Sequence, residues 1–234
     1  MNTEAVISVL VFLFVMAAII SEKVHRSVAA MAGAVVLLLF HVLSIDEATS
    51  YVDINTIGVL VGMMLFVAVV KNSGLFEYVA IKAAKIAKGN PWKIMLLFTL
   101  LTAALSAFLD NVTTVLLVGP MAIAITGILG IDPVPFLLAQ ILASNIGGTA
   151  TLIGDPPNIM IGSQAGLSFM DFVANTGVAV VFIMAALCLC FYFMFGKKLV
   201  VAPEKMAAVM QLDENKSIKD HALLVKSIVM IVVV

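Results

Sequence analysis

Long apolar runs separated by short polar segments constrain this sequence more than any other feature. The runs cover roughly residues 5–20, 27–43, 54–70, 94–109, 112–130, 134–153, 159–167 and 172–195. Hydrophobic residues make up 63% of the chain and charged residues 12%, about half the charged share of a typical soluble domain. A soluble core of this size cannot bury so much apolar surface, whereas lipid accepts apolar side chains on every face of a helix. We therefore expect an all-α polytopic membrane protein.

Four of these runs are predicted to cross the membrane as plain helices. A helix needs about 20 residues to span the hydrocarbon core, and the runs at 5–20, 27–43, 54–70 and 172–195 come near or exceed that length. A final run begins near Leu223 and is still apolar at Val234. We expect residues 223–234 to be the start of a next helix in a longer protein.

The basic residues predict the orientation in the membrane. All thirteen Lys and Arg lie after the first span, after the third span, or after the span that ends near residue 195, and the loops 44–53 and 164–171 carry none. By the positive-inside rule, the N-terminus lies outside and residues 196–222 are cytoplasmic, in a multi-pass protein of the cell membrane. Residues 74–89 are predicted to form either an interfacial helix on the cytoplasmic surface or an ordinary solvated loop helix.

Two polar breaks interrupt the stretch between Ile94 and Gly196, which contains no Lys or Arg. The first is DNVTT, Asp110–Thr114, and the second is SNIGGTATLIGDPPN, Ser144–Asn158. Broken backbone at membrane depth is tolerated only where protein or a water-filled cavity satisfies its polar groups. A carboxylate costs several kcal/mol there, so Asp110 and Asp155 are functional candidates.

The breaks combine oxygen ligands with helix ends. Carbonyls at helix C-termini attract cations and helix N-termini attract anions, and secondary transporters place such discontinuous helices near the midplane. The first break is either the tip of a re-entrant hairpin or a link between two spans. Both give five net crossings, so a second copy of the repeat would be inverted. Two simpler interpretations remain: Asp110 is a helix N-cap in a short external loop, or Gly154–Asn158 is a surface turn.

The two breaks also resemble a known family. The segments FLDNVTTVLLVGP (Phe108–Pro120) and ASNIGGTATLIGDPPNIMIG (Ala143–Gly162) resemble the Ion Transporter superfamily, in its P-protein and ArsB–NhaD-like branch of citrate-transporter-like permeases. The resemblance covers roughly residues 5–200, the first of two repeats in that family. It implies one of two inverted repeats, with a re-entrant hairpin and an unwound transmembrane helix.

The resemblance also implies the residues of an ion- and substrate-binding site. The hairpin tip would hold four of them and the unwound helix eight: Asp110, Asn111, Thr113 and Thr114, then Ser144, Asn145, Gly147, Gly148, Thr149, Thr151, Asp155 and Asn158. A Na⁺ ion would be held by Asp110, Asn111, Asn145 and Thr149. Dicarboxylate-type relatives have a Ser-Asn-Thr tip where this chain has Asp110, a departure that favours cation or proton coupling.

We expect a secondary active transporter that moves a small ion or anion, coupled to Na⁺ or H⁺. Arsenite export, Na⁺/H⁺ antiport and symport of di- or tricarboxylates all stay open, although no cysteine lies near the breaks as a soft ligand for a metalloid. An intramembrane aspartyl protease using Asp110 and Asp155 is disfavoured by the residues around them, and a channel by the lack of a ring of like charge. No enzymatic activity is expected.

The predicted organisation follows from these patterns. Residues 1–200 form the N-terminal transmembrane repeat, with the hairpin at 93–130 and the broken helix at 134–163. Residues 197–222 form a cytoplasmic linker, and residues 223–234 begin the truncated helix. The expected partners are the lipid bilayer, the transported ion and a missing C-terminal repeat, a homodimer is left open, and neither a nucleic acid nor a cofactor is expected.

Overall fold

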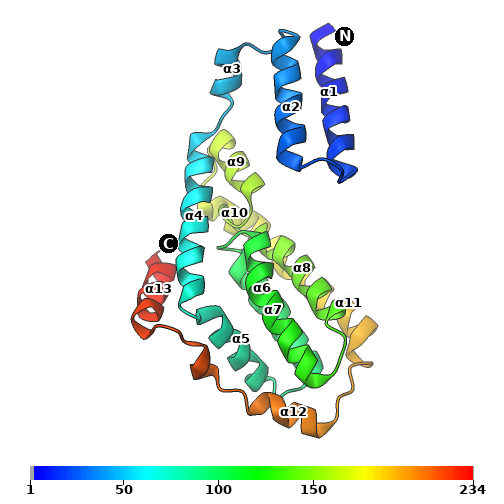
Figure 1. Ribbon diagram of the computed structural model, residues 1–234, viewed down its shortest axis with the longest axis vertical. Helices are drawn as coiled ribbons and strands as arrows, with labels where there is room; N and C mark the ends of the chain where they lie inside the picture. The colour runs from blue at the N-terminus through cyan, green and yellow to red at the C-terminus, as the bar shows by residue number, and fades with distance from the viewer. Residues whose placement is uncertain (1–2, 234) are drawn as a thin grey trace. The chain divides into compact units, whose positions relative to one another are not determined.

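The computed structural model describes residues 3–233, and the regular secondary structure in that part of the chain is helical (Figure 1). Residues 1–2 and 234, at the two ends of the predicted organisation, lie outside the described residues. The chain divides into two compact units, Met1–Ile54 and Asn55–Val234, which we describe separately.

The first unit is a helical hairpin followed by a short helix. Helix α1 (Thr3–Ile20) packs against α2 (Arg26–Leu39). Gly33 of α2 meets the Val15 side chain of α1, where a Cβ at position 33 would clash. Helix α3 (Ile45–Ser50) starts with a capping box, in which Ser44 and Glu47 each bond to the other's backbone N–H.

The second unit contains the remaining helices. In chain order they are α4 (Ile54–Asn72), α5 (Leu75–Ile86), α6 (Pro91–Ser106), α7 (Asn111–Leu129), α8 (Val134–Gly148), α9 (Pro156–Ala165), α10 (Phe169–Phe172), η1 (Val173–Gly177), α11 (Val178–Phe191), η2 (Tyr192–Gly196), α12 (Pro203–Met210), η3 (Glu214–Ser217) and α13 (His221–Val233).

Among residues 3–233, four helical segments are long and apolar enough to cross a membrane. They are Thr3–Ile20, Ile54–Asn72, Asn111–Leu129 and Phe169–Gly196. The run predicted at 27–43 forms a shorter helix, α2, of 14 residues, because the chain turns at His41, whose φ is positive. The run predicted at 172–195 forms α11 with a π-helical turn at each end, η1 and η2.

The core of the second unit lies where α6, α7 and α8 pack together with α5 (Figure 1). Its fully buried side chains include Ile94, Met95 and Phe98 of α6, Ile125 of α7 and Phe136 of α8. Each of these helices has a sequence-encoded start: Asn90 caps α6, Asp110 caps α7, and Pro133 and Pro135 open α8. These starts fix where the intervening breaks fall.

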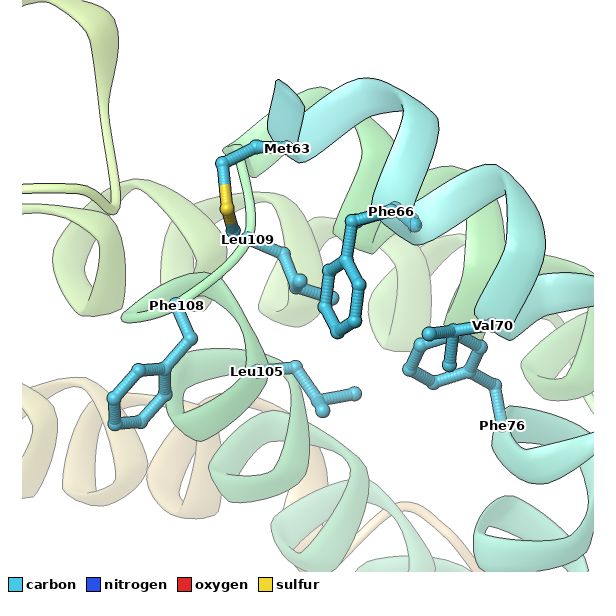
Figure 2. A pocket seen from close by; sticks show the side chains of 8 residues that line it. Met63, Phe66, Val70, Phe76, Leu105, Phe108 and Leu109 are labelled. Carbon is cyan, nitrogen blue, oxygen red and sulfur yellow. The ribbon is translucent and has the colours of Figure 1, made fainter. Parts of the chain in front are cut away.

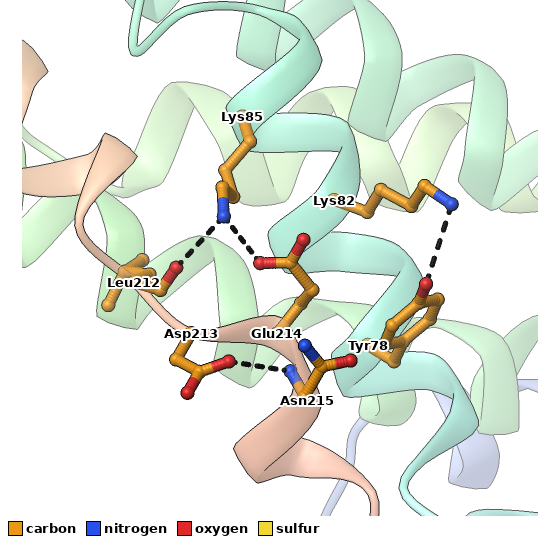
Figure 3. Close-up of polar contacts among 7 residues, drawn as sticks. All are labelled: Tyr78, Lys82, Lys85, Leu212, Asp213, Glu214 and Asn215. Atoms are coloured by element: carbon orange, nitrogen blue, oxygen red, sulfur yellow. Dashed lines mark hydrogen bonds and ion pairs between the residues drawn. The ribbon is translucent and has the colours of Figure 1, made fainter.

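The linker after residue 196 packs against other helices of the second unit. Helix α12 contacts α5 and α7, and η3 contacts α5. Lys85 of α5 donates to the carboxylate of Glu214 at 2.5 Å and to the carbonyl of Leu212 at 3.3 Å (Figure 3). The apolar face of α5, including Phe76, Ala80 and Ala84, is buried by protein. Helix α5 thus uses that face for packing within the unit.

Candidate ion-binding site

The first break is a four-residue link between α6 and α7. The Oδ1 atom of Asp110 accepts a hydrogen bond of 2.9 Å from the backbone N–H of Thr113. The hydroxyl of Thr114 donates to the Asp110 carbonyl at 2.9 Å. Asp110 is therefore the N-cap of α7, and Asn111–Thr114 belong to its first turn. The prediction that Asp110 is a helix N-cap is confirmed. Because residues 111–114 are helical, only Asp110 of the polar segment 110–114 lies outside a helix.

The second break spans residues 149–155, between α8 and α9. It is also shorter than the polar stretch, because Ser144–Gly148 complete the last turn of α8 and Asn158 lies in the first turn of α9. The side-chain amide of Asn158 donates to the carbonyls of Gly148 at 3.1 Å and Thr151 at 2.8 Å. One amide side chain thereby satisfies two carbonyls that the unwound backbone leaves free.

The two breaks meet in space. The Nδ2 of Asn111 donates to the Oδ1 of Asn145 at 2.9 Å, and the hydroxyl of Ser106 donates to the Ser144 carbonyl at 2.7 Å. The Thr151 hydroxyl donates to the carbonyl of Ala107. Each of these bonds joins the α6–α7 connection to α8 or to the unwound segment after it.

Glycines allow this close approach. A Cβ at Gly147 would meet the backbone of Ala103 in α6, and a Cβ at Gly154 would meet the carbonyls of Gly148 and Ser106. Any side chain at these positions would push α8 and the unwound segment away from α6.

The carboxylates of Asp110 and Asp155 line one cavity of about 510 Å³. Asn111, Thr113 and Leu116 also line it from the first break and α7, and Leu60, Met63 and Met64 line it from α4. Helices α7 and α9 both begin here, directly after Asp110 and Asp155. Within the described residues, the side chain of Asp155 makes no capping hydrogen bond.

The structure separates the predicted site residues into two groups. Asp110, Asn111, Thr113 and Asp155 line the cavity, and Asn145 is bonded to Asn111 beside it. The other group supports the backbone: Thr114, Ser144, Gly147 and Gly148 are buried between helices, Asn158 holds the unwound carbonyls, Thr151 bonds to Ala107, and the Thr149 hydroxyl donates to the Ile146 carbonyl at 2.7 Å. Of the four residues predicted to bind Na⁺, Asp110 and Asn111 line this cavity, and Asn145 and Thr149 do not.

An apolar pocket flanks the first break on the side of α4. Figure 2 shows Leu105 of α6 and Leu109 of the following link on the side of Met63 and Phe66 of α4. Phe108 of the same link also lines the pocket. The pocket is small, about 50 Å³, and its lining is apolar, so it places a hydrophobic wall beside the polar break.

Three buried polar residues of the α6–α8 interface were not among the site residues predicted from the sequence. Thr102 and Ser106 lie on one face of α6, and Gln140 lies one turn before Ser144 on α8; all three are fully buried. The sequence did indicate them, because they are polar residues spaced one helical turn apart within apolar runs. They precede the breaks and so fell outside the segments that looked functional.

Helical segments of membrane-spanning length, together with two polar breaks that meet in space, are typical of a polytopic membrane protein with an internal polar site. A family model described as "Citrate transporter" matches residues 16–234. The chain belongs to this family, within the Ion Transporter superfamily.

Curated relatives share this sequence over most of its length. An uncharacterized transporter of Mycobacterium tuberculosis is 42% identical over 226 residues, which cover 95% of this chain and 52% of the relative. The 46 kDa membrane protein of Mycobacterium leprae is 40% identical, over 98% of this chain and 54% of the relative. The human P protein is 39% identical over 197 residues, which cover 81% of this chain and 24% of the relative. The chain spans about half the length of the mycobacterial relatives.

Proposed function

We propose that the protein is a secondary active transporter that moves a small ion or anion across the membrane, coupled to Na⁺ or H⁺. The observation that carries the proposal is the cavity that Asp110 and Asp155 share at the paired breaks. The family description and the word "transporter" in the names of relatives support a carrier over the intramembrane protease and the channel.

The chemistry of the cavity favours coupling to a cation. Two carboxylates close to one another repel, and both can stay ionised only if a cation lies between them. Helices α6 and α8 end at the breaks, so their terminal carbonyls add negative potential. A Na⁺ ion would be bound by Asp110 and Asn111 with help from Asn145, and a proton would reside on one of the two carboxylates.

The starts of α7 and α9 favour an anionic cargo once the cation is bound. Both helix N-termini lie at the cavity, and the positive ends of their helix dipoles attract negative charge when the carboxylates are neutralised. The family description favours an organic anion such as citrate. Arsenite export and Na⁺/H⁺ exchange are the competing outcomes, and a second, inverted repeat would complete the site in each case.

Transport by the intact protein in sealed vesicles tests the proposal. Uptake and efflux of citrate, succinate and arsenite are measured under an imposed Na⁺ gradient and under an imposed pH gradient, with a sample lacking substrate. Flux of one substrate that depends on one gradient and is lost in Asp110→Asn supports the coupled carrier and names its cargo. Na⁺-driven proton movement without substrate identifies an exchanger.

A matched carboxylate provides the control for this experiment. Asp132 is exposed in the turn between α7 and α8, where its Oδ1 accepts from the Val134 N–H, and it does not line the cavity. Asp132→Asn should transport as the unmodified protein does. Equal flux in Asp110→Asn and Asp132→Asn would refute the role of Asp110, and the absence of gradient-dependent flux for every substrate would count against the carrier.

A further inference from the structure

Two buried side chains in the α6–α8 interface lack hydrogen-bond partners. In the part of the chain that the structure describes, both amide atoms of Gln140 and the hydroxyl oxygen of Thr102 are buried without a partner. Both residues are 0% exposed. An unpaired amide or hydroxyl in an apolar interior costs about 1–3 kcal/mol, so native proteins pair such groups with protein or with ordered water.

The position of these groups limits what can pair with them. Thr102 lies one turn before Ser106, and Gln140 lies one turn before Ser144, on the helix faces that the Ser106–Ser144 hydrogen bond joins. They are therefore one turn deeper in the helix bundle than the paired breaks. Within the described residues, no side chain hydrogen-bonds to these atoms. A small molecule such as water can pair with them without opening the α6–α8 interface.

Space for such a species exists beside Gln140. Gly119 of α7 faces it: a Cβ at position 119 would lie 3.5 Å from Leu137 Cδ2 and 4.0 Å from Gln140 Oε1, both ordinary contact distances. The missing side chain thus leaves a space of about one methyl group, comparable with the volume of about 30 Å³ that one water molecule occupies in the liquid.

We propose that Gln140 and Thr102 form a buried binding site for a water molecule between α6, α7 and α8. Water matches this pair because it accepts a hydrogen bond from the Gln140 amide N–H and donates one to the Thr102 hydroxyl oxygen. A bare cation would be bound by the oxygens and repelled by the amide N–H.

The bound water links α6 to α8 one turn before the Ser106–Ser144 hydrogen bond. It therefore supports the helix interface that brings the two polar breaks together.

Substitution of Gly119 by alanine tests the proposal without a transport assay. The alanine Cβ fills the space and displaces the water, and the comparison is Gly127→Ala in the same helix, where a Cβ meets no atom within 4 Å. Alanine is otherwise favoured over glycine in helices. We expect Gly119→Ala to lower the unfolding temperature of the intact protein in detergent by a few degrees, and Gly127→Ala to raise it or leave it unchanged.

The apolar variant Gln140→Met completes the cycle, because methionine removes the groups that need the water and keeps the side-chain length. In that background Gly119→Ala should no longer lower the unfolding temperature. An effect of Gly119→Ala that is the same in both backgrounds, of either sign, overturns the proposal. Should Gln140→Met not fold, a cryo-EM map that resolves ordered waters elsewhere in the helices decides: density within hydrogen-bond distance of Gln140 supports the site, and its absence overturns it.

Discussion

Asn111 at the start of α7 and Asn145 near the end of α8 are joined by a hydrogen bond of 2.9 Å between their side-chain amides. The two residues are 34 positions apart in the chain, and each belongs to a different polar break. The Asn145 amide also donates to the Ile141 carbonyl at 2.8 Å. The side-chain oxygen of Asn145 thus accepts from Asn111, while its side-chain nitrogen donates to the backbone of α8. Together the two bonds tie Asn111 to α8.

A double-mutant cycle on this pair measures how strongly the breaks are coupled. Asn111→Ala and Asn145→Ala should each destabilise the protein, and the double variant by less than their sum. A coupling of about 0.5–1.5 kcal/mol is expected for one neutral hydrogen bond, measured by chemical unfolding in detergent. Strictly additive effects would show that the two amides do not interact in solution.

The charge of Asp110 should matter more for ion dependence than for folding. Asparagine caps helices about as well as aspartate, so Asp110→Asn should change the free energy of unfolding by less than about 0.5 kcal/mol. Loss of a contact to a charged group, worth about 1.5–3 kcal/mol, should weaken cation dependence of transport tenfold or more. Asp110→Ala separates the two roles, since it also removes the cap. Unchanged ion and pH dependence in Asp110→Asn would rule the carboxylate out of coupling.

Alanine at Gly147 should separate α6 from α8. The added Cβ would meet the backbone of Ala103, which cannot rotate away as a side chain could. Overpacking of this kind costs about 1–3 kcal/mol, which should appear as a lower unfolding temperature. Gly58→Ala in α4 is the control, because a Cβ there meets nothing within 4 Å. Equal stability of the two variants would mean that the helices are farther apart than described here.

The ion pair between α5 and the linker should weaken in acid. The hydrogen bond from Lys85 lowers the pKa of the Glu214 carboxyl below its ordinary value of 4.5. A carboxyl with a lowered folded-state pKa contributes stability above its unfolded pKa, and that contribution is lost as the pH falls through the folded value. The unfolding temperature of Glu214→Gln should therefore lie below that of the unmodified protein at neutral pH and converge with it below about pH 4.

Asp213 supplies the comparison for this pH experiment. Its Oδ1 accepts a hydrogen bond from the Asn215 N–H at 3.1 Å (Figure 3), a role that asparagine can keep. Asp213→Asn removes the same charge one residue away and should show a smaller difference at neutral pH. A difference in Glu214→Gln that persists unchanged into acid would contradict the ion pair as its cause.

The sequence predicted the class of fold and the place of the breaks. Apolar runs at 94–109 and 112–130 became α6 and α7, because long apolar runs can satisfy their backbone only as helices in lipid. Family membership was also predicted from the two motifs and is confirmed by the match over residues 16–234. The re-entrant hairpin, the inverted repeat and the membrane orientation stay predictions.

Helix ends and helix contacts were decided by tertiary structure. The sequence marks Asp110–Thr114 and Ser144–Asn158 as polar, but capping by Asp110 and close packing of Gly147 on Ala103 keep part of each stretch helical. Composition and periodicity indicate which residues of a segment will be buried, and both are read from the local sequence alone. The pairing of Asn111 with Asn145, and the burial of Thr102 and Gln140, depend on the angle and register at which α6, α7 and α8 meet, which is set by contacts between residues far apart in the chain.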